Sequence, residues 1–307
     1  SIKANMADCS PTVLLTVPLL LEKMLARVMD GVQENFAGRW MFRLGLAKVI
    51  GYKVSAGMGG ALRLVVSGGA PIRPVTLQTW TKLGIPVLEG YGITETAPVL
   101  CVNPPEAPRI GAVGPPLSGI EIRIHEPNAD GVGEIVVRGD NVMQGYYNHA
   151  EETAQVLIDG WYYTGDLGRF DDAGYLVIKG RKKSLIVNRE GKNIYPEEVE
   201  QQAMQSRYVL ECLVLGYCDS GDDPGERVGM IVVPDQQVFD ELENAEGRCF
   251  SEAEIEKIVR DDVRAQMAHL SDYKRPRRIE VRFEEFEKTA TQKIKRYLYA
   301  VNTASEP

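Results

Sequence analysis

Two short apolar runs, each ending in a glycine-rich turn, constrain the fold of the first part of this chain more than any other feature. The run 62–66 leads into Ser67-Gly-Gly-Ala-Pro71, and the run 86–88 leads into Gly90-Tyr-Gly92. A helical pattern over 74–83 separates the two runs. Strand, helix and strand within about thirty residues predict a βαβ unit and a parallel sheet. Both turns then follow the carboxyl ends of strands, where such sheets bind ligands.

The pattern of elements changes twice further along the chain. From about residue 111, short alternating strands at 120–124, 134–138 and 175–179 predict a small antiparallel, barrel-like subdomain. From about residue 180, helices that begin at Pro196 and Ser251 alternate with strands, which predicts an α+β unit. We therefore expect an α/β plus α+β protein. Its expected parts are a partial parallel-sheet α/β subdomain (1–110), a β subdomain (111–180) that completes a first domain (1–180), and an α+β domain (181–307).

The composition excludes several classes of protein. The 307 residues carry 35 basic and 43 acidic side chains, a net charge of −8, which argues against a nucleic-acid binder. The most apolar stretch, 13–21, has about half the length that a bilayer requires. Five scattered cysteines without a Cys-x-x-Cys pair indicate a reducing compartment. We expect a cytoplasmic protein without an integral membrane segment, and peripheral contact at the inner membrane face is left open.

Four polar sequence strings contain side chains that could bind a ligand or act in catalysis, and each also has a purely structural interpretation. Glu89-Gly-Tyr-Gly-Ile-Thr-Glu95 provides an aromatic face, a hydroxyl and a hard carboxylate oxygen suited to Mg²⁺, or is a simple glycine turn. Trp161-Tyr-Tyr-Thr-Gly-Asp166 ends in a carboxylate that could accept ribose hydroxyls, or is a common turn. Gly180-Arg-Lys-Lys-Ser184 could contact ribose or phosphate oxygens, or is a solvated linker. The string 288–296 could bring a lysine to a developing anion, or begins a basic helix.

In this order and spacing, the four strings resemble successive motifs of the acyl-adenylate-forming superfamily. That superfamily includes acyl-CoA synthetases, luciferases and nonribosomal peptide adenylation domains. The resemblance runs through essentially the whole chain, and it is closest to bacterial long-chain fatty acid–CoA ligases. Two strings, Gly191-Lys-Asn-Ile-Tyr-Pro-Glu-Glu198 and Lys288-Thr-Ala-Thr-Gln-Lys-Ile-Lys-Arg296, are typical of that branch. The resemblance implies a ligase that forms acyl-AMP from a fatty acid and ATP–Mg²⁺, and then acyl-CoA from coenzyme A, with release of AMP.

The resemblance also implies roles for residues of the first domain. Tyr91 would stack on the adenine, Thr94 would contact the α-phosphate, and Glu95 would hold Mg²⁺. Asp166 would accept the ribose hydroxyls. The other implied nucleotide contacts in this domain are Gly69, Ala70, Glu89, Gly90, Gly92 and Ile178.

In the second domain the resemblance implies a mobile lid. Arg181 would assist Asp166 at the ribose, and Lys183 would be the hinge at which the lid rotates. Lys293 would reach the α-phosphate and the substrate carboxylate during adenylation, and with Thr94 and Glu95 it forms the implied catalytic set. A basic cluster, 274–278, could meet the phosphates of CoA, but a solvated turn is the simpler interpretation.

One expected motif is absent from the sequence. The superfamily's phosphate loop, a Ser/Thr/Gly-rich run that closes on Pro-Lys-Gly, should lie upstream of Thr94, and nothing over 1–68 resembles it. We therefore expect the carboxyl-terminal portion of a longer ligase, inactive when alone. Two alternatives stay open: an acyl-AMP ligase that loads a carrier protein, and a non-catalytic nucleotide-binding or interaction module. The expected partners are small molecules (fatty acid, ATP and CoA), and the sequence predicts neither the acyl chain length nor the oligomeric state.

Overall fold

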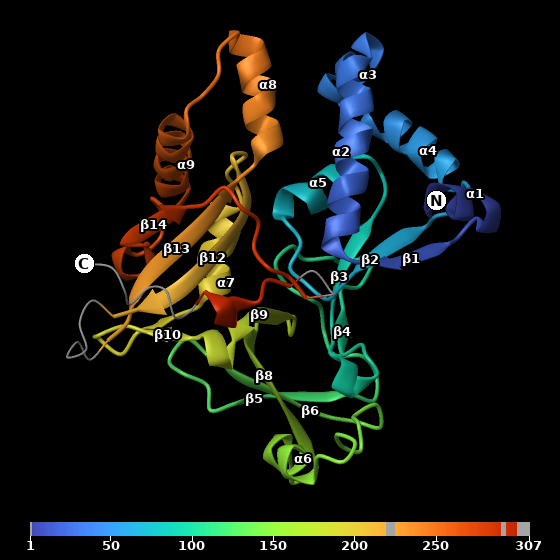
Figure 1. The fold of residues 1–307 in the computed structure, drawn as a ribbon. Coiled ribbons are helices and arrows are strands. Elements are labelled where there is room, and N and C mark those ends of the chain that lie inside the picture. The colour runs from blue at the N-terminus through green and yellow to red at the C-terminus, as the bar shows by residue number, and fades with distance from the viewer. Residues whose placement is uncertain (1, 219–224, 290–292, 300–307) are drawn as a thin grey trace. The chain divides into compact units, whose positions relative to one another are not determined.

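A computed structural model describes residues 2–218, 225–289 and 293–299. The chain divides into two compact units, Ser1–Ile178 and Lys179–Pro307 (Figure 1). Each unit has its own buried apolar clusters, so each is described by itself below.

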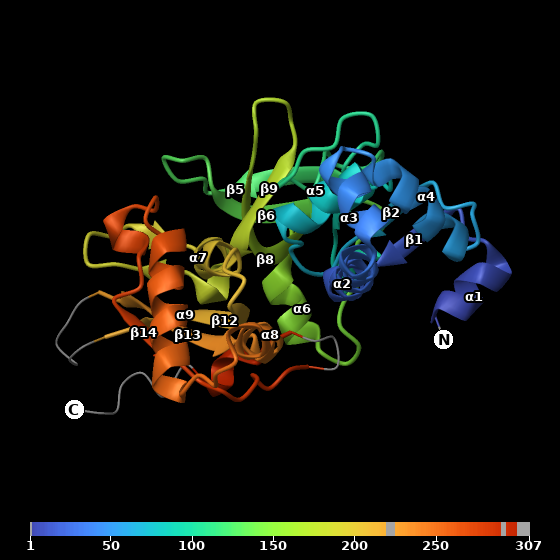
Figure 2. The same cartoon turned by 90° about the horizontal axis from the view of Figure 1, so that it is seen from above.

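The first unit opens with a four-stranded sheet in the order β1-β2-β3-β4. β1 pairs with β2, and β2 with β3, in parallel, whereas β4 is antiparallel to β3. The predicted βαβ unit and parallel sheet are therefore confirmed. Helices α2 to α5 lie beside this sheet (Figure 2). The elements are α1 (Ile2–Cys9), β1 (Val13–Thr16), α2 (Pro18–Glu34), α3 (Phe36–Arg43), α4 (Ala47–Gly57), β2 (Leu64–Ser67), α5 (Pro74–Lys82), β3 (Val87–Tyr91), the 3-10 turn η1 (Thr94–Thr96) and β4 (Cys101–Val102).

An apolar core holds these helices to the sheet. Leu21 of α2, Trp80 of α5 and Leu83 are each 1% exposed and belong to one cluster with Val65 of β2. Trp80 and Leu77 share a face of α5 because they are three residues apart. This packing fixes α5 between β2 and β3, and it thereby fixes the two turns that follow those strands.

The first unit ends in an antiparallel sheet in the order β5-β6-β8-β7, with β9 also paired to β8. This confirms the predicted change to short antiparallel strands. The ten-residue strand β8 was not predicted, because the sequence interpretation placed a turn at its Thr-Gly-Asp segment. The elements are β5 (Glu121–His125), β6 (Gly133–Arg138), α6 (Ala150–Val156), β7 (Leu157–Ile158), β8 (Trp161–Phe170) and β9 (Leu176–Arg181).

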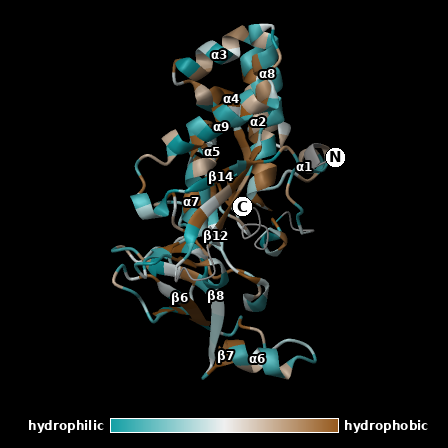
Figure 3. Cartoon of the chain, turned by 60° about the vertical axis from the view of Figure 1, so that its left-hand side comes forward, coloured by the Kyte–Doolittle hydropathy of each residue, from teal (hydrophilic) through white to brown (hydrophobic). Residues whose placement is uncertain are grey.

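The second unit is the predicted α+β fold. Its sheet has the order β12-β13-β14, antiparallel and then parallel, and a short hairpin β10-β11 precedes it. Helices α8 and α9 mix hydrophilic and hydrophobic segments, as expected for helices with one buried face (Figure 3). The elements are η2 (Lys182–Ser184), β10 (Ile186–Val187), β11 (Asn193–Ile194), α7 (Pro196–Ala203), β12 (Val209–Tyr217), β13 (Arg227–Pro234), α8 (Gln236–Glu246), α9 (Glu252–Gln266), η3 (Asp272–Lys274), β14 (Arg278–Val281) and η4 (Arg296–Leu298).

Across the described ranges 2–218, 225–289 and 293–299, no helix has the length and apolarity that crossing a membrane demands.

Helix α9 begins with the capping box that the sequence predicts. The Ser251 hydroxyl accepts a hydrogen bond from the Glu254 amide, and the Glu254 carboxylate accepts one from the Ser251 amide at 2.8 Å. The Ser251 amide, and after it the Ser251 hydroxyl and Arg248, donate to this carboxylate and hold the pKa of Glu254 down, at about 2. The cap orients the stripe Ile255, Val259 and Val263, which is buried in the second unit's core.

Replacing Ser251 with Ala removes the cap, and we expect the free energy of unfolding of the second unit to fall by about 1 kcal/mol. Hydrogen exchange of the α9 amides measures this loss. Ser271→Ala is the matched control, because Ser271 precedes η3 without a side-chain cap bond. Equal effects of the two substitutions would contradict the assignment of the cap.

Candidate functional site

The two glycine-rich turns lie side by side at the carboxyl end of the parallel sheet. β2 ends at Ser67, which pairs with Glu89, and β3 continues to Tyr91. A Cβ built on Gly68 would lie 3.5 Å from the Gly90 carbonyl oxygen. Gly69 adopts a φ of +84° and has open space where a side chain would be. The predicted ligand-binding edge therefore has backbone from both turns and room beside it.

Position 92 must be glycine because the neighbouring backbone leaves no space for a side chain. A Cβ at Gly92 would lie 1.7 Å from the Pro98 carbonyl oxygen, which no side chain could tolerate. A Cβ at Gly90 would lie 3.4 Å from the Cys101 carbonyl oxygen of β4. The sequence interpretation assigned both glycines to close approach of a ligand, whereas the structure gives Gly92 a packing role and leaves an ordinary contact distance at Gly90. Their contact with adenine stays a prediction.

Tyr91 and Asp166, which are 75 residues apart in the chain, meet directly. The Tyr91 hydroxyl donates a hydrogen bond of 2.6 Å to Asp166 Oδ2. Asp166 is 5% exposed, so its carboxylate has lost most of its contact with water. Tyr91 and Ile178 both pack against the apolar cluster that contains Leu100 and Leu176. Three residues predicted to hold the nucleoside are thus gathered in the first unit.

A bulge in β8 turns Asp166 toward Tyr91. Glu134 of β6 pairs with Leu167 and Val136 with Tyr163, so β8 has two residues more than β6 between these pairs. Gly165, inside the bulge, has a φ of +68°, and its amide donates to the Glu134 carboxylate at 3.1 Å. Bulges of this kind redirect side chains at functional sites.

Hydrogen bonds within the strand pair hold the bulge. The Thr164 hydroxyl donates to the Ile135 carbonyl at 2.8 Å and accepts from the Asp166 amide at 3.0 Å. Thr164, Asp166 and Glu134 are all buried, so each polar group here needs a partner. The Thr-Gly-Asp segment is therefore a fixed part of the sheet and not the open turn that its composition suggests.

Glu95 is tied to the same strand by two tyrosines. The Tyr146 hydroxyl donates to Glu95 Oε1 at 3.0 Å, and it lies 3.4 Å from the hydroxyl of Tyr162 in β8. Backbone bonds add to this, because the Met143 amide donates to the Glu95 carbonyl at 2.8 Å. Thr94, at the start of η1, leaves its side chain exposed. Glu95 is thus connected to β8, the strand that contains Asp166.

The Glu89 side chain contacts the loop at Gly111. Its carboxylate accepts a hydrogen bond from the Gly111 amide at 3.2 Å. Burial raises the pKa of Glu89 from 4.5 to about 7, and the bond from Gly111 opposes the rise only in part. Its predicted contact with the nucleotide stays a prediction, and the contact that the structure gives it is to the loop at Gly111.

The remaining predicted site residues belong to the second unit. Arg181 ends β9, and Lys183 lies in η2; both are exposed. Lys293 is exposed as well. Their contact with the nucleotide-binding residues of the first unit stays a prediction.

The neighbours of Lys293 distinguish it from the other cations of its segment. Lys288 pairs with Glu211 and Glu285, Lys295 with Glu287, and Arg296 with Glu200. Among the residues that the structure describes, Lys293 has no carboxylate partner. Thr291 and Gln292 of the same motif lie outside the described residues. The segment thus holds its other cations in ion pairs and leaves the predicted catalytic lysine exposed.

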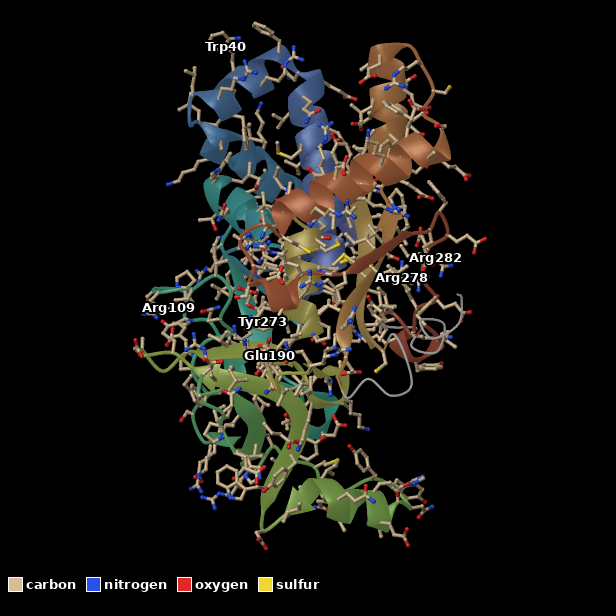
Figure 4. The ribbon with its side chains drawn as sticks, turned by 90° about the vertical axis from the view of Figure 1, so that its left-hand side faces the viewer. Trp40, Arg109, Glu190, Tyr273, Arg278 and Arg282 are labelled. Carbon is tan, nitrogen blue, oxygen red and sulfur yellow. The ribbon has the colours of Figure 1, made fainter. Side chains whose placement is uncertain are left out.

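The basic cluster 274–278 is largely engaged in local contacts. Lys274 pairs with Glu198 at 2.8 Å, and Arg275 donates to two backbone carbonyls that follow α9. Arg277 pairs with Asp272. Arg278 is exposed at the start of β14 (Figure 4). These contacts favour the solvated-turn interpretation over a CoA phosphate site.

Sequence reasoning assigned no role to several residues that build the site. Tyr146 orients Glu95, Glu134 and Thr164 hold the bulge, and the Asn141 amide donates to the Thr96 carbonyl at 2.7 Å. The strings Gly133-Glu-Ile135 and Gly145-Tyr-Tyr-Asn148 contain two of these residues and also resemble the superfamily. That resemblance was the available indication, but it attached no role to them.

A magnesium ion fits this site only with help from phosphate. Over the described residues, no group of three or more His, Cys, Asp or Glu side chains converges on one point. Mg²⁺ is commonly bound by one or two carboxylates together with substrate phosphates and waters. Glu95, half-buried and oriented by Tyr146, meets the protein's share of that requirement.

Comparison with known proteins decides the family. A sequence profile described as "AMP-binding enzyme" matches residues 2–147, and its companion, "AMP-binding enzyme C-terminal domain", matches residues 198–293. The chain belongs to the AMP-binding enzyme family. The family's two successive parts match in the expected order, one in each unit of this chain.

Its relatives are CoA ligases of differing substrate. The long-chain-fatty-acid–CoA ligase FadD15 of Mycobacterium bovis is 31% identical over 83% of this chain and 43% of its own length. ATP-bound MatB from Rhodopseudomonas palustris aligns with a TM-score of 0.71 at 28% identity, over 98% of this chain and 53% of that one.

A further solved relative is O-succinylbenzoate coenzyme A synthetase (MenE) from Bacillus subtilis, in complex with ATP and magnesium ion. Its TM-score is 0.62 at 30% identity, over 77% of this chain and 46% of that chain. This chain thus spans about half the length of the relatives that it matches.

The raised pKa of Glu89 predicts a pH-dependent stability for this chain. Between pH 4.5 and about 7 the unfolded chain has released the Glu89 proton and the folded chain has not, so ionisation opposes folding. We expect the free energy of unfolding of the first unit to fall by about 3 kcal/mol across this window through Glu89. Glu89→Gln, which keeps an acceptor for the Gly111 amide, should abolish that fall.

Urea unfolding at pH 5 and pH 8, followed by tryptophan fluorescence, measures this fall in the free energy of unfolding. Trp40, Trp80 and Trp161 all lie in the first unit. Glu106→Gln is the control, because Glu106 is exposed on a nearby loop. An unchanged pH dependence in Glu89→Gln would contradict the account of Glu89.

Proposed function

We propose that this chain is the adenylate-binding and lid portion of an AMP-forming long-chain acyl-CoA synthetase. The complete reaction joins a fatty acid, ATP and CoA into acyl-CoA, AMP and pyrophosphate through an acyl-AMP intermediate. The observation that carries the proposal is the hydrogen bond between Tyr91 and the buried Asp166 beside the glycine-rich turns. The choice of a long-chain acid is supported by the similarity to FadD15 and by the strings 191–198 and 288–296.

Different residues of the first unit contact different parts of the nucleotide. Asp166 accepts the ribose hydroxyls, because a buried carboxylate with fixed orientation can bind two neighbouring hydroxyls. The Tyr91 ring supplies an apolar face for adenine, and its hydroxyl keeps the Asp166 carboxylate in place. Thr94, exposed at η1, is available to the α-phosphate.

Glu95, through Mg²⁺, and Lys293 stabilise the negative charge of the phosphates. When bound, Mg²⁺ neutralises phosphate charge while the carboxylate of the fatty acid attacks. Glu95 holds its carboxylate toward that ion and keeps its orientation through Tyr146. Lys293 carries its charge to the α-phosphate, where negative charge builds up, and losing one such contact typically costs about 3–4 kcal/mol in the barrier.

The second unit acts as a lid in this proposal. Lys183 in η2 is the hinge, and rotation there presents different residues to the bound acyl-AMP in the two half-reactions. Arg181, two residues earlier, assists at the ribose. The acceptor is CoA; a carrier-protein acceptor is the enzymatic alternative.

A non-catalytic module is the alternative from another class. Its support is the missing hydroxyl-rich phosphate loop over 1–68. Against it, Tyr91, Glu95 and Asp166 keep polar contacts that a lapsed site has no need to maintain. Nucleotide binding separates the ligase from an interaction module that binds no nucleotide.

The chain by itself is expected to make no acyl-CoA, because it lacks the loop that grips the triphosphate. Incubation with ATP, Mg²⁺, a long-chain fatty acid and CoA, followed by chromatography of nucleotides and thioesters, tests this. A complete CoA ligase is the positive control. Release of AMP that depends on the fatty acid would contradict the expectation.

AMP and a non-hydrolysable acyl-AMP mimic are expected to bind the chain, and Asp166→Asn should weaken their binding about 10- to 100-fold through lost charge-assisted bonds. Equilibrium dialysis measures both affinities. Asp172→Asn is the matched control, because Asp172 is an exposed carboxylate just after β8. Equal affinity of the two variants, or no binding by the unchanged chain, would favour the module.

A further inference from the structure

The segment that carries Lys293 is anchored to helix α7 through Arg296. The Arg296 guanidinium donates to both oxygens of Glu200, at 2.7 and 2.6 Å, and to the Val214 carbonyl at 3.1 Å. Glu200 also accepts from the Val214 amide at 2.8 Å. The Glu200 side chain is 15% exposed and that of Arg296 28%. A two-pronged, partly desolvated pair of this kind fixes geometry as well as charge.

A second anchor holds the other end of the segment. Lys288 pairs with Glu211 of β12 and with Glu285. Backbone bonds close the loop between the anchors, from the Thr289 amide to the Lys293 carbonyl and from the Lys295 amide to the Glu287 carbonyl, each 2.9 Å. Lys293 therefore projects from a closed loop with both ends fixed to the second unit.

Helix α7 also touches the strand that leads to the predicted hinge. A Cβ built on Gly180 would lie 2.2 Å from Glu197 Oε2 and 2.9 Å from its Cδ, so the carboxylate occupies the side-chain space of this glycine. Gly180 comes three residues before Lys183. The Glu197 carboxylate reaches within 3.8 Å of the Arg296 guanidinium on its other side. Its buried Oε2 has no hydrogen-bond partner among the described residues.

These contacts put one acidic pair between two functional segments. We propose that Glu197 and Glu200, with Arg296, couple the hinge segment 179–186 to the lysine segment 286–299, and so position Lys293 according to the state of the hinge. Arg296, Glu197 and Glu200 are positioning residues in this account. The inference rests on the roles proposed above for Lys183 and Lys293.

The acidic pair suits a coupling role because its two carboxylates lie at unequal distances from the guanidinium that they share. Two carboxylates share one guanidinium, and Glu197, at 3.8 Å, holds it less tightly than Glu200 does. A displacement of Gly180 acts on Glu197 first, since the Glu197 carboxylate occupies the side-chain space of this glycine. The moved Glu197 carboxylate then pulls on Arg296, which is three residues from Lys293. A rotation at the hinge can thus reach the lysine segment within the second unit.

Amide hydrogen exchange of the complete chain, read by mass spectrometry, tests the coupling without any ligand. Arg296→Met should accelerate exchange about tenfold in both segments, 179–186 and 286–299, and leave α9 unchanged. Arg296→Lys, which keeps a charge beside Glu200, should restore protection partly and to the same degree in both segments. Glu197→Gln should alter both segments as well.

Glu198→Gln is the matched control, because Glu198 lies on the same helix and pairs with Lys274. It should leave both segments unchanged. Acceleration confined to 286–299, or spread evenly over the second unit, would overturn the proposal. If Arg296→Met does not fold, Arg296→Lys and Glu197→Gln still decide, since the two segments must respond together. The outcome is independent of AMP binding, so failure here leaves the proposed function standing.

Discussion

The hydrogen bond between Tyr91 and Asp166 is the contact on which the candidate site depends. It joins the end of the parallel sheet to the antiparallel sheet of the same unit. A buried carboxylate is costly unless it is hydrogen-bonded, so Asp166 can be retained there only with such partners. The bulge in β8 supplies the required direction, because two additional residues turn the strand locally. Without that bulge, Asp166 would follow the ordinary alternation of the strand.

The second unit uses charge in a different way. Lys288, Lys295 and Arg296 are all neutralised by carboxylates, and these pairs hold the segment in shape. Lys293 stays exposed on the same segment. A catalytic cation must keep its charge available for a developing anion, whereas its neighbours serve best when paired. The distribution of ion pairs thus separates structural cations from the one with a proposed chemical role.

Local patterns made part of this fold predictable. Apolar periodicity and glycine turns predict the βαβ unit over 62–92, and the Ser251–Glu254 spacing predicts the start of α9; both are confirmed. Strand β8 was missed because Thr164-Gly-Asp166 interrupts the alternation that marks a strand. A bulge has the composition of a turn, and only its pairing with β6 distinguishes the two.

The site itself was predictable only in part. The order of motifs named Tyr91, Glu95 and Asp166, but no local rule brings residues 75 positions apart into contact. The supporting residues, such as Tyr146, act through tertiary contacts that a single sequence does not display. The burial of Glu89 is likewise a property of the packed loop around Gly111.

A double-mutant cycle on nucleotide affinity tests most directly whether Tyr91 and Asp166 act as one adenylate site. The dissociation constant of AMP is measured for the chain, for Tyr91→Phe, for Asp166→Asn and for the double variant. We predict a coupling energy of about 1 kcal/mol or more, because each residue binds AMP in a geometry that the other maintains. Additive effects, within about 0.5 kcal/mol, would contradict a shared site.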